Sequence, residues 1–240
     1  MAIYVGDKRY GLYVGDTRRK VMGVKAPIPA SSYIQDGLIA MYDGIENAGA
    51  GQHSNSATTW KDLVGSNDLS LQGNLGWGSK YFLFDGSSYF FKDATNIADP
   101  ITVEVVAAFG NTGYISWFQY KGTKMVHVRT VSSKMCACLT NTHVAHTYEF
   151  TNLVPSTISA NYSNSQVCQN GSLLSTTGAG ARGVTSATDN MLVGVTYYYK
   201  YTSYFDDKIY CIRLYSRVLT SEEIAFNHSI DVQRFGLETT

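Results

Sequence analysis

Apolar and polar residues alternate with a period of two along much of the chain, which is typical of β-strands. The alternation is clearest at 101–109, where Ile101, Val103, Val105, Ala107 and Phe109 fall on one face and are expected to line a core. Shorter segments separated by turn residues predict further strands near residues 38–42, 69–71, 81–84, 88–91, 113–119, 124–130, 134–139, 146–150, 156–162, 165–169 and 190–195.

The longest apolar stretch, residues 208–215, carries charge only at its first residue and at Arg213, which predicts a strand buried on both faces. Thr220 and Glu223 then have the spacing of a capping box, so we expect a helix to begin near Ser221. No second helix is expected. The pattern therefore predicts an all-β chain whose closing strand is central, followed by one short helix that caps the end of the structure.

Residues 205–224 follow the order FxxKIxxIRLYxRxLxxEEI, which resembles the closing segment of laminin-G-like and concanavalin A-like lectin/glucanase domains. Weaker matches in the same order extend the resemblance over residues 36–235: GLIAMYD, WKDLVGSNDLSL, YFLFDGSSYF, ITVEVVAAF, VCQNGSLL and MLVGV. The resemblance implies two antiparallel sheets packed as a jelly-roll sandwich, with one short C-terminal helix, over residues 37–240. It implies no particular activity, because this fold carries lectins, hydrolases and structural modules alike.

The start of the chain differs from the rest in pattern and in charge. IYVGD at 3–7 and LYVGD at 12–16 form a short repeat, and each copy predicts a small strand that ends in a turn. Residues 1–25 hold six basic and two acidic residues, a charge of +4 in a chain whose formal net charge is zero. We expect a β arm at 1–27, and the prolines near its end predict an extended linker at 28–36.

Repeats of this kind resemble the leaders of structural proteins from tailed bacteriophages, where they precede a displayed domain. Short exposed strands have unpaired edges, which complete sheets in neighbouring subunits. The residues expected to dock the arm are Tyr4, Lys8, Arg9, Tyr13, Arg18 and Arg19. The alternative is a hairpin packed on its own domain.

Composition narrows the possible partners. Charged residues make up only 16% of the chain, so it lacks the positive field that non-specific nucleic-acid binding needs. We find neither a signal-peptide pattern nor an apolar stretch long enough to span a membrane, and we expect synthesis in the cytosol. The four cysteines lie in expected strands and are interpreted as buried thiols. Cys136 and Cys138 share one face, but no histidine pair lies near them in the sequence to suggest zinc.

Motifs of catalysis are not found. Glycoside hydrolases of the resembled group carry acidic residues on one strand as ExDxE or ExDxxE, whereas Glu104 and Glu149 stand isolated in this sequence. There is no GxSxG elbow, and His143 and His146 lack the spacing that would place two imidazoles on one face. We expect no catalytic residue, no cofactor and no metal site.

Five tyrosines crowd residues 196–204, the connection that leads into the closing strand: Tyr197, Tyr198, Tyr199, Tyr201 and Tyr204. Tyrosine has an apolar ring and a polar tip, so this loop is expected to contact either a glycan or another protein. Alternatively, the rings extend the core. The polar loop at 45–59 is a second candidate for the rim of a binding site.

Three hypotheses follow. The first is a non-enzymatic virion structural protein, a capsid decoration, head-fibre or tail-associated subunit, displayed on the virion surface. Its partners would be other virion proteins and further copies of the chain. The second is a carbohydrate-binding module that attaches to host-surface or mucus polysaccharide through loops 45–59 and 196–204. The third is a glycoside hydrolase, against which the missing carboxylate pair argues.

Overall fold

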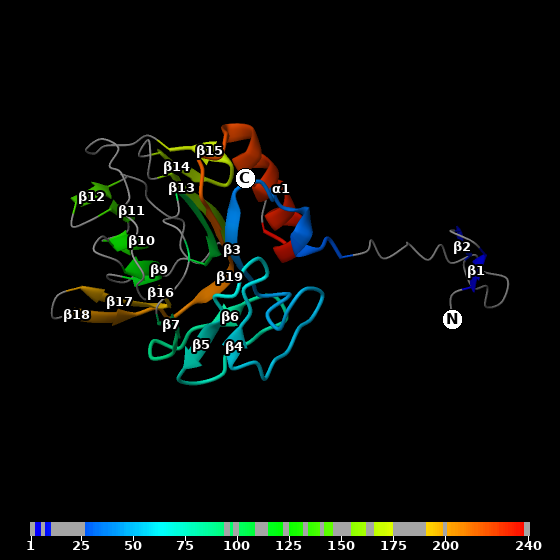
Figure 1. Cartoon of the computed structure of the whole chain (residues 1–240), viewed down its shortest axis with the longest axis horizontal. Helices are drawn as coiled ribbons and strands as arrows, with labels where there is room; N and C mark the ends of the chain where they lie inside the picture. Colours follow the sequence, from blue (N-terminus) through cyan, green and yellow to red (C-terminus); the bar gives the residue numbers. More distant parts are fainter. Residues whose placement is uncertain are drawn as a thin grey trace.

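We describe the fold from a computed structural model (Figure 1). It describes backbone and side chains for residues 27–93, 97, 101–108, 155–161, 166–174, 191–195 and 204–237, and the backbone alone for strands at 3–5, 8–10, 115–121, 125–131, 134–139, 142–145, 196–198 and 201–203. Outside these residues lie Tyr13, Arg18, Arg19 and Tyr199, the strand expected in the repeat at 12–16 and the strand expected at 146–150.

The described strands form two large antiparallel sheets, as expected for a β-sandwich jelly roll (Figure 1). The first sheet has seven strands: β15 (Ser172–Leu173), β14 (Gln166–Gln169), β13 (Ser156–Asn161), β8 (Thr102–Ala107), β19 (Lys208–Tyr215) and β3 (Leu38–Asp43) in spatial order, with β6 (Phe82–Leu83) also paired to β19. The closing strand β19 therefore has neighbours on both sides.

The second sheet has eight strands: β12 (Thr142–Ala145), β11 (Lys134–Leu139), β10 (Met125–Val131), β9 (Ile115–Lys121), β16 (Met191–Val193), β7 (Tyr89–Lys92), β5 (Leu69–Gln72) and β4 (Thr59–Trp60) in spatial order. Two smaller sheets pair β17 (Val195–Tyr198) with β18 (Tyr201–Tyr204), and β1 (Ile3–Val5) with β2 (Lys8–Tyr10). The remaining elements are the 3-10 helix η1 (Ala30–Ser32) and the helix α1 (Ser221–Phe235).

The main core lies between the two sheets and follows the predicted alternation. Val103, Val105 and Ala107 of β8 meet Phe90 of β7 and Val193 of β16 there, and all five are fully buried. At about 25 cal/mol for each Å² of apolar surface removed from water, burial of this kind is the main stabilising contribution to the fold. One face of β8 therefore belongs to the core, as its sequence predicts.

The other face of the seven-stranded sheet is buried as well, because α1 and residues 28–34 cover it. A second apolar cluster there includes Met41, Val106 and Cys211 from the sheet and Ile224 and Ile230 from the helix. All six residues of β8 are buried for this reason. We expected α1 to cap the end of the sandwich; instead it lies across a sheet face, where its hydrogen bonds reach both β8 and β13.

A row of residues in register crosses this covered face. Met41 opposes Arg213, Arg213 opposes Glu104, Glu104 opposes Ser159, and Ser159 opposes Cys168. A guanidinium can be buried at such a place only if carboxylates neutralise it. Arg213 is fully buried and donates to Glu104 on β8 and to Asp231 on α1. The row therefore fixes the helix to the sheet.

Residues 28–36, expected as an extended linker, pack on the body instead. Ala30 and Tyr33 are buried, the Ala30 amide donates to Glu46 Oε1 (2.7 Å), and the Tyr33 hydroxyl donates to Asp231 Oδ1 (2.7 Å). The Arg213 guanidinium lies 4.1 Å from the centre of the Tyr33 ring, close enough for a cation–π contact. The segment belongs to the second apolar cluster.

Helix α1 begins with the capping box that the sequence predicts. The Thr220 hydroxyl accepts from the Glu223 amide (3.3 Å), and the Glu223 carboxylate accepts from the Thr220 amide (2.9 Å). Gly236 ends the helix in the left-handed conformation, with φ 72°. Of the helices among the described residues, none is both long and apolar enough to cross a membrane.

Candidate functional site

Aromatic and polar side chains alternate with core residues on the eight-stranded sheet. Phe90 of β7 points into the core, so its neighbours Tyr89 and Phe91 lie on the outer face. The strand register places Gln72 opposite Tyr89 and Ser70 opposite Phe91. Residues directly opposite one another share a face, so two aromatic and two polar side chains meet there. Ser70 is exposed and the other three are half-buried.

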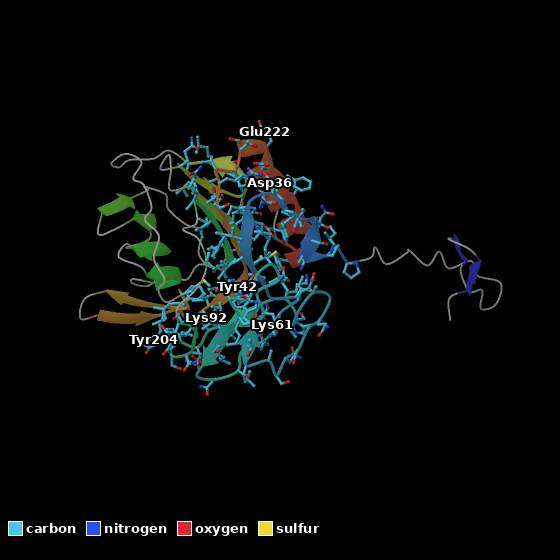
Figure 2. The ribbon with its side chains drawn as sticks, in the orientation of Figure 1. Asp36, Tyr42, Lys61, Lys92, Tyr204 and Glu222 are labelled. Carbon is cyan, nitrogen blue, oxygen red and sulfur yellow. The ribbon has the colours of Figure 1, made fainter. Side chains whose placement is uncertain are left out.

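Tyr204 extends this group from the far end of the chain. It is half-buried at the end of β18, and its ring centre lies 6.1 Å from that of Tyr89, with the ring planes inclined at 50°. Figure 2 labels Tyr204 below the β17–β18 hairpin and Tyr42 in the interior of the sandwich. We call Ser70, Gln72, Tyr89, Phe91 and Tyr204 the outer aromatic face.

The predicted tyrosine loop is a β-hairpin. The register of β17 with β18 pairs Val195 with Tyr204, Tyr197 with Thr202, and Tyr198 with Tyr201. Val195 is fully buried, so the base of the hairpin is packed against the body of the fold. Of the five predicted tyrosines, Tyr204 is the one whose side chain is described. Tyr204 therefore belongs both to the predicted tyrosine loop and to the outer aromatic face.

A glycine bends the chain where the hairpin leaves the sandwich. Gly194 separates β16 from β17 and has φ +83°, and its carbonyl accepts from the Phe205 amide (2.9 Å). A Cβ atom at this position would lie 2.1 Å from the Phe84 ring. The position therefore requires glycine for its conformation and for its lack of a side chain. Tyr204 reaches Tyr89 because the chain turns here.

An ordered acidic turn borders the outer aromatic face. Asp85 Oδ1 accepts from the Ser87 and Ser88 amides at 2.9 and 2.7 Å, and Oδ2 accepts from the Asn74 side chain at 3.1 Å. These hydrogen bonds, the one from Asn74 foremost, lower the pKa of Asp85, so the carboxylate is ionised at neutral pH. The exposed Asp206 lies beside this turn, because a Cβ atom on Gly86 would lie 3.8 Å from the Asp206 Cβ.

The loop at 45–59 leads into the same sheet. Its base is ordered by Asn47, which donates to the Ser54 carbonyl (2.8 Å) and accepts from the Ser54 amide (2.8 Å). Its tip exposes Gln52, His53 and Asn55. The loop ends at Thr59, which opposes Ser70 in the sheet. The loop thus continues the edge of the outer aromatic face.

A pocket lies beside β3, between that strand and residues 29–35. It has a volume of about 200 Å³. Its lining is Pro29, Ala30, Ser31, Gln35, Leu38, Met41, Glu46, Ala50, Gly51, Leu63 and Val64. Glu46 is the one ionisable group in this lining, and both of its oxygens accept backbone hydrogen bonds, from Ala30 and Gly51. The pocket therefore offers few free polar groups to a ligand.

The buried carboxylates lie together under α1, where they are paired with arginines. Glu104 and Asp231 both accept from Arg213, and Asp43 accepts from Arg234. Desolvation raises the pKa of Glu104, while the nearby Arg213 charge opposes this. Glu104, which seemed isolated in the sequence, is therefore part of a charge cluster that folding brings together. Its place beneath the helix gives it a structural role.

Tyr89 and Phe91 were not predicted as site residues, because the pattern at 88–91 indicates only a strand. The signal was present in part, since aromatic residues at 89, 90 and 91 place rings on both faces of one strand. Nothing local indicates that Tyr204 would lie beside Tyr89. The docking-arm residues Tyr4, Lys8 and Arg9 lie on β1 and β2, where only the backbone is described.

No family model matches the chain, and no curated protein sequence matches it either. Solved structures do share its fold. The sialidase of Trypanosoma rangeli, in complex with sialic acid, is 13% identical with a TM-score of 0.57, and the match covers 80% of this chain and 32% of the sialidase.

Two binding domains are similar as well. The binding domain of botulinum neurotoxin DC, in complex with rat synaptotagmin II, is 11% identical with a TM-score of 0.56, over 80% of this chain and 51% of that domain. Domain 4 of AbnA, a GH43 extracellular arabinanase from Geobacillus stearothermophilus in complex with arabinotriose, is 14% identical with a TM-score of 0.53, over 78% and 96% of the two chains.

The chain thus spans about a third of the sialidase and half of the neurotoxin domain, but nearly all of the arabinanase domain. At these identities the similarity shows a shared β-sandwich fold. It leaves the activity of the chain to be argued from its own residues.

Proposed function

We propose that this chain is a carbohydrate-binding module that holds a neutral glycan on its outer aromatic face. The observation that carries the proposal is the contact of Tyr89 with Tyr204 beside Gln72. Tyrosine rings offer apolar surface to the C–H faces of a sugar and a hydroxyl at the tip, and a glutamine amide both donates and accepts. A glycan needs this combination because its rings present apolar faces and hydroxyl edges together.

The charges beside the face favour a neutral sugar over an acidic one. Asp85 and Asp206 border the Tyr89–Tyr204 pair, and both carboxylates are exposed. Like charges close to one another are unfavourable, so a sialic acid or uronic acid would be repelled. Lys92, also on β7, falls on the opposite face from Tyr89 and Phe91 by the alternation of the strand. The described part of the face therefore carries no cation to hold a carboxylate.

Similar structures are consistent with this proposal. The arabinanase domain is in complex with arabinotriose, so a sandwich of this shape occurs in complex with a neutral sugar in one of the proteins compared. The match covers 96% of the arabinanase domain, as is expected if this chain forms a separate module of the same kind.

We propose a binding module rather than an enzyme. Retaining glycoside hydrolysis needs two carboxyl groups about 5–5.5 Å apart in a cleft that a sugar can enter. Glu104 and Asp231, which folding brings together on Arg213, are fully buried. Through Arg213 they join helix α1 to the sheet, and because both are buried a substrate cannot reach them.

Glycan-array screening followed by calorimetry tests the proposal. We expect the full chain to bind neutral oligosaccharides, and Tyr89→Ala or Tyr204→Ala to weaken binding by about tenfold or more, on the order of 1–2 kcal/mol for an aromatic contact. Tyr81→Ala is the matched control. Its ring also pairs with a tyrosine, Tyr210, but on the other sheet, so this variant should keep the wild-type affinity.

Two results would contradict the proposal: no binding of any glycan at millimolar concentration, or equal affinities for the wild type and for Tyr89→Ala. The neutral class is tested separately by comparing matched oligosaccharides with and without a terminal sialic acid. Stronger binding of the sialylated member would overturn the charge argument and leave the aromatic site intact. The Asp85→Asn variant should reduce the difference in affinity between the neutral and the sialylated oligosaccharide.

The hairpin and the arm remain separate predictions. Tyr197, Tyr198 and Tyr199 replaced together by alanine test whether the hairpin adds to the site beyond Tyr204. The virion role stays a prediction from residues 1–25, because none of the three structures compared concerns a virion. Deletion of residues 1–27 would test it, since a body that folds but no longer assembles is expected.

A further inference from the structure

The two carboxyl oxygens of Glu104 differ in their partners. Oε2 accepts from Arg213 Nε and from Asn227 Nδ2, both at 2.8 Å. Oε1 is equally closed to solvent, and none of the described groups donates to it. An ionised carboxylate only accepts hydrogen bonds, so burial of one of its oxygens without a donor is unfavourable. A protonated carboxyl group avoids this cost, because one oxygen then accepts and the other donates.

Asp231, the other carboxyl group on Arg213, has donors at both oxygens. Oδ1 accepts from the Tyr33 hydroxyl and from Arg213 Nη1, each at 2.7 Å. Oδ2 accepts from Arg213 Nη2 and from the Thr157 hydroxyl, each at 2.8 Å. These four donors identify Asp231 as the ionised partner, and its bidentate pair with Arg213 balances the guanidinium charge. Glu104 is then left without a cation of its own.

The charges that face Glu104 argue against a second anion. The titratable groups around it are Arg213 and Tyr215 on β19, Asp231 on α1 and Cys168 on β14. Burial raises the pKa of Cys168 to about 11 and that of Tyr215 above its usual value, so both are neutral at neutral pH. An ionised Glu104 would therefore leave a net negative charge in a site closed to solvent, which is unfavourable.

The neighbouring arginine has no charge to spare. Arg234 of α1 pairs with Asp43 Oδ1 at 2.8 Å and with Glu46 Oε1 at 3.3 Å, so it too lies between two buried carboxyl groups. Arg234 and Arg213 lie near the same Tyr33 ring, at 5.7 and 4.1 Å from its centre, so the two clusters adjoin. In each cluster one arginine faces two carboxyl groups. A proton on Glu104 reduces this excess of negative charge.

An acceptor for such a proton lies on the next strand. The register places Ser159 of β13 opposite Glu104, and residues directly opposite one another share a face. The Ser159 hydroxyl is buried, and no described group is hydrogen-bonded to it. Its oxygen can accept a hydrogen bond from a protonated Oε1 across the pair of strands.

We propose that Glu104 is a proton-binding site: the folded chain keeps this carboxyl group protonated at neutral pH, and the attachment of α1 to the sheet weakens as alkaline conditions remove the proton. The electrostatics of the site act in the same direction. Burial raises the pKa of Glu104 and the Asp231 charge adds to the shift, whereas Arg213 opposes it. None of these groups belongs to the outer aromatic face, so the proposal does not depend on glycan binding.

The proton links folding to pH. In the unfolded chain a glutamate has its usual pKa of about 4.5, and burial raises the pKa in the folded chain. The stability that the bound proton contributes is therefore full below about pH 4.5 and is lost as the pH rises through the folded pKa. Between the two values, each unit of pH should raise the unfolding constant about tenfold relative to a chain that cannot titrate at residue 104.

Glu104→Gln is the matched variant. Glutamine has the shape of the protonated acid, its carbonyl oxygen can accept from Arg213 and Asn227, and its amide can donate where Oε1 carries the proton. We expect this variant to be at least as stable as the wild type at neutral pH. Urea denaturation of both full chains should show the ratio of wild-type to variant unfolding constants rising about tenfold per pH unit between about pH 5.5 and about pH 7.

Asp231→Asn is the control in the same cluster. It removes the ionised partner of Arg213, so the unfolding constant should rise by about a hundredfold or more at neutral pH. The proton can also be observed directly, by NMR of the wild type with labelled carbon at the glutamate side-chain carboxyl groups. One resonance should keep the chemical shift of a protonated carboxyl group at neutral pH, and it should be missing from Glu104→Gln.

A loss of stability in Glu104→Gln as large as that in Asp231→Asn would overturn the proposal, because Glu104 would then be an ionised partner of Arg213. A pH profile of Glu104→Gln parallel to that of the wild type would overturn it as well. If Glu104→Gln does not fold, the NMR spectrum of the wild type decides the question. The proposal fails if every glutamate carboxyl group is ionised at neutral pH.

Discussion

Arg213 of β19 and Asp231 of α1 are joined by two parallel hydrogen bonds of 2.7 and 2.8 Å, and neither side chain is exposed to solvent. Arg213 also donates to Glu104 at 2.8 Å, so one guanidinium serves two carboxylates. Burial alone would lower the pKa of Arg213, but the two carboxylates raise it well above its usual value. The arginine is therefore charged at any pH at which the chain folds.

Breaking this pair should be among the most damaging single changes in the chain. Arg213→Met would leave Asp231 and Glu104 buried without their cation, and we expect a loss of about 3–5 kcal/mol in the free energy of unfolding. Urea denaturation measures it. Lys61→Met is the control, because the Lys61–Asp68 pair is partly exposed to solvent and should contribute about 1 kcal/mol or less. Equal losses in the two variants would refute a dominant role for the buried pair.

Gly194 should tolerate no side chain. Gly194→Ala combines an unfavourable left-handed conformation with a Cβ atom 2.1 Å from the Phe84 ring, so we expect a loss of about 2–5 kcal/mol. Gly51→Ala is matched to it in conformation, with φ +69°, but its Cβ would meet no atom within 4 Å. That variant should lose only about 1–2 kcal/mol. Thermal unfolding of both variants separates the cost of the steric overlap from that of backbone strain. Similar losses of unfolding free energy in the two variants would show that the overlap with the Phe84 ring contributes little.

Local patterns predicted the elements of this fold well. The alternation at 101–109, the apolar run of β19 and the box at Thr220 each depend on residues a few positions apart, and each is found where expected. Such signals are local because strand faces and helix starts are decided by neighbouring side chains. The order of segments then indicated the sandwich.

What the sequence did not indicate are contacts between distant segments. The partner of Arg213 lies on a helix 18 residues later, and the partner of Tyr204 lies on a strand more than a hundred residues earlier. The prolines near residues 28–36 favoured a linker. The sequence did not indicate that Tyr33 would donate to Asp231, because these two residues are far apart in the chain.

The cap of α1 offers a test of local stabilisation. Thr220→Ala removes the hydroxyl that accepts from the Glu223 amide, and we expect a loss of about 0.5–2 kcal/mol in unfolding free energy. Thr220→Ser keeps the hydroxyl and should stay close to the wild type. Chemical denaturation distinguishes them. If Thr220→Ser lost as much as Thr220→Ala, the methyl group rather than the cap would explain the effect.

His228 should make the stability of the chain depend on pH. Its Nδ1 lies 3.0 Å from the Thr157 hydroxyl, which in turn donates to Asp231, so Nδ1 must carry a proton and donate. Burial lowers the pKa of His228 below its usual value of 6.5, and the Arg213 charge lowers it further, whereas Asp231 opposes the shift. The folded chain thus holds the imidazole neutral at a pH where the unfolded chain protonates it.

The direction in which the unfolding free energy changes with pH follows from proton linkage. Below about pH 6.5 the unfolded state binds more protons than the folded state, so the contribution of His228 is full above that pH and is lost as the pH falls through the folded pKa. We expect the wild type to lose more unfolding free energy than His228→Gln between about pH 7.5 and about pH 5.5 in urea titrations. Glutamine can still donate to Thr157. His53→Gln, which alters an exposed imidazole, should keep the wild-type dependence. A His228→Gln profile parallel to that of the wild type would show that other groups cause the loss.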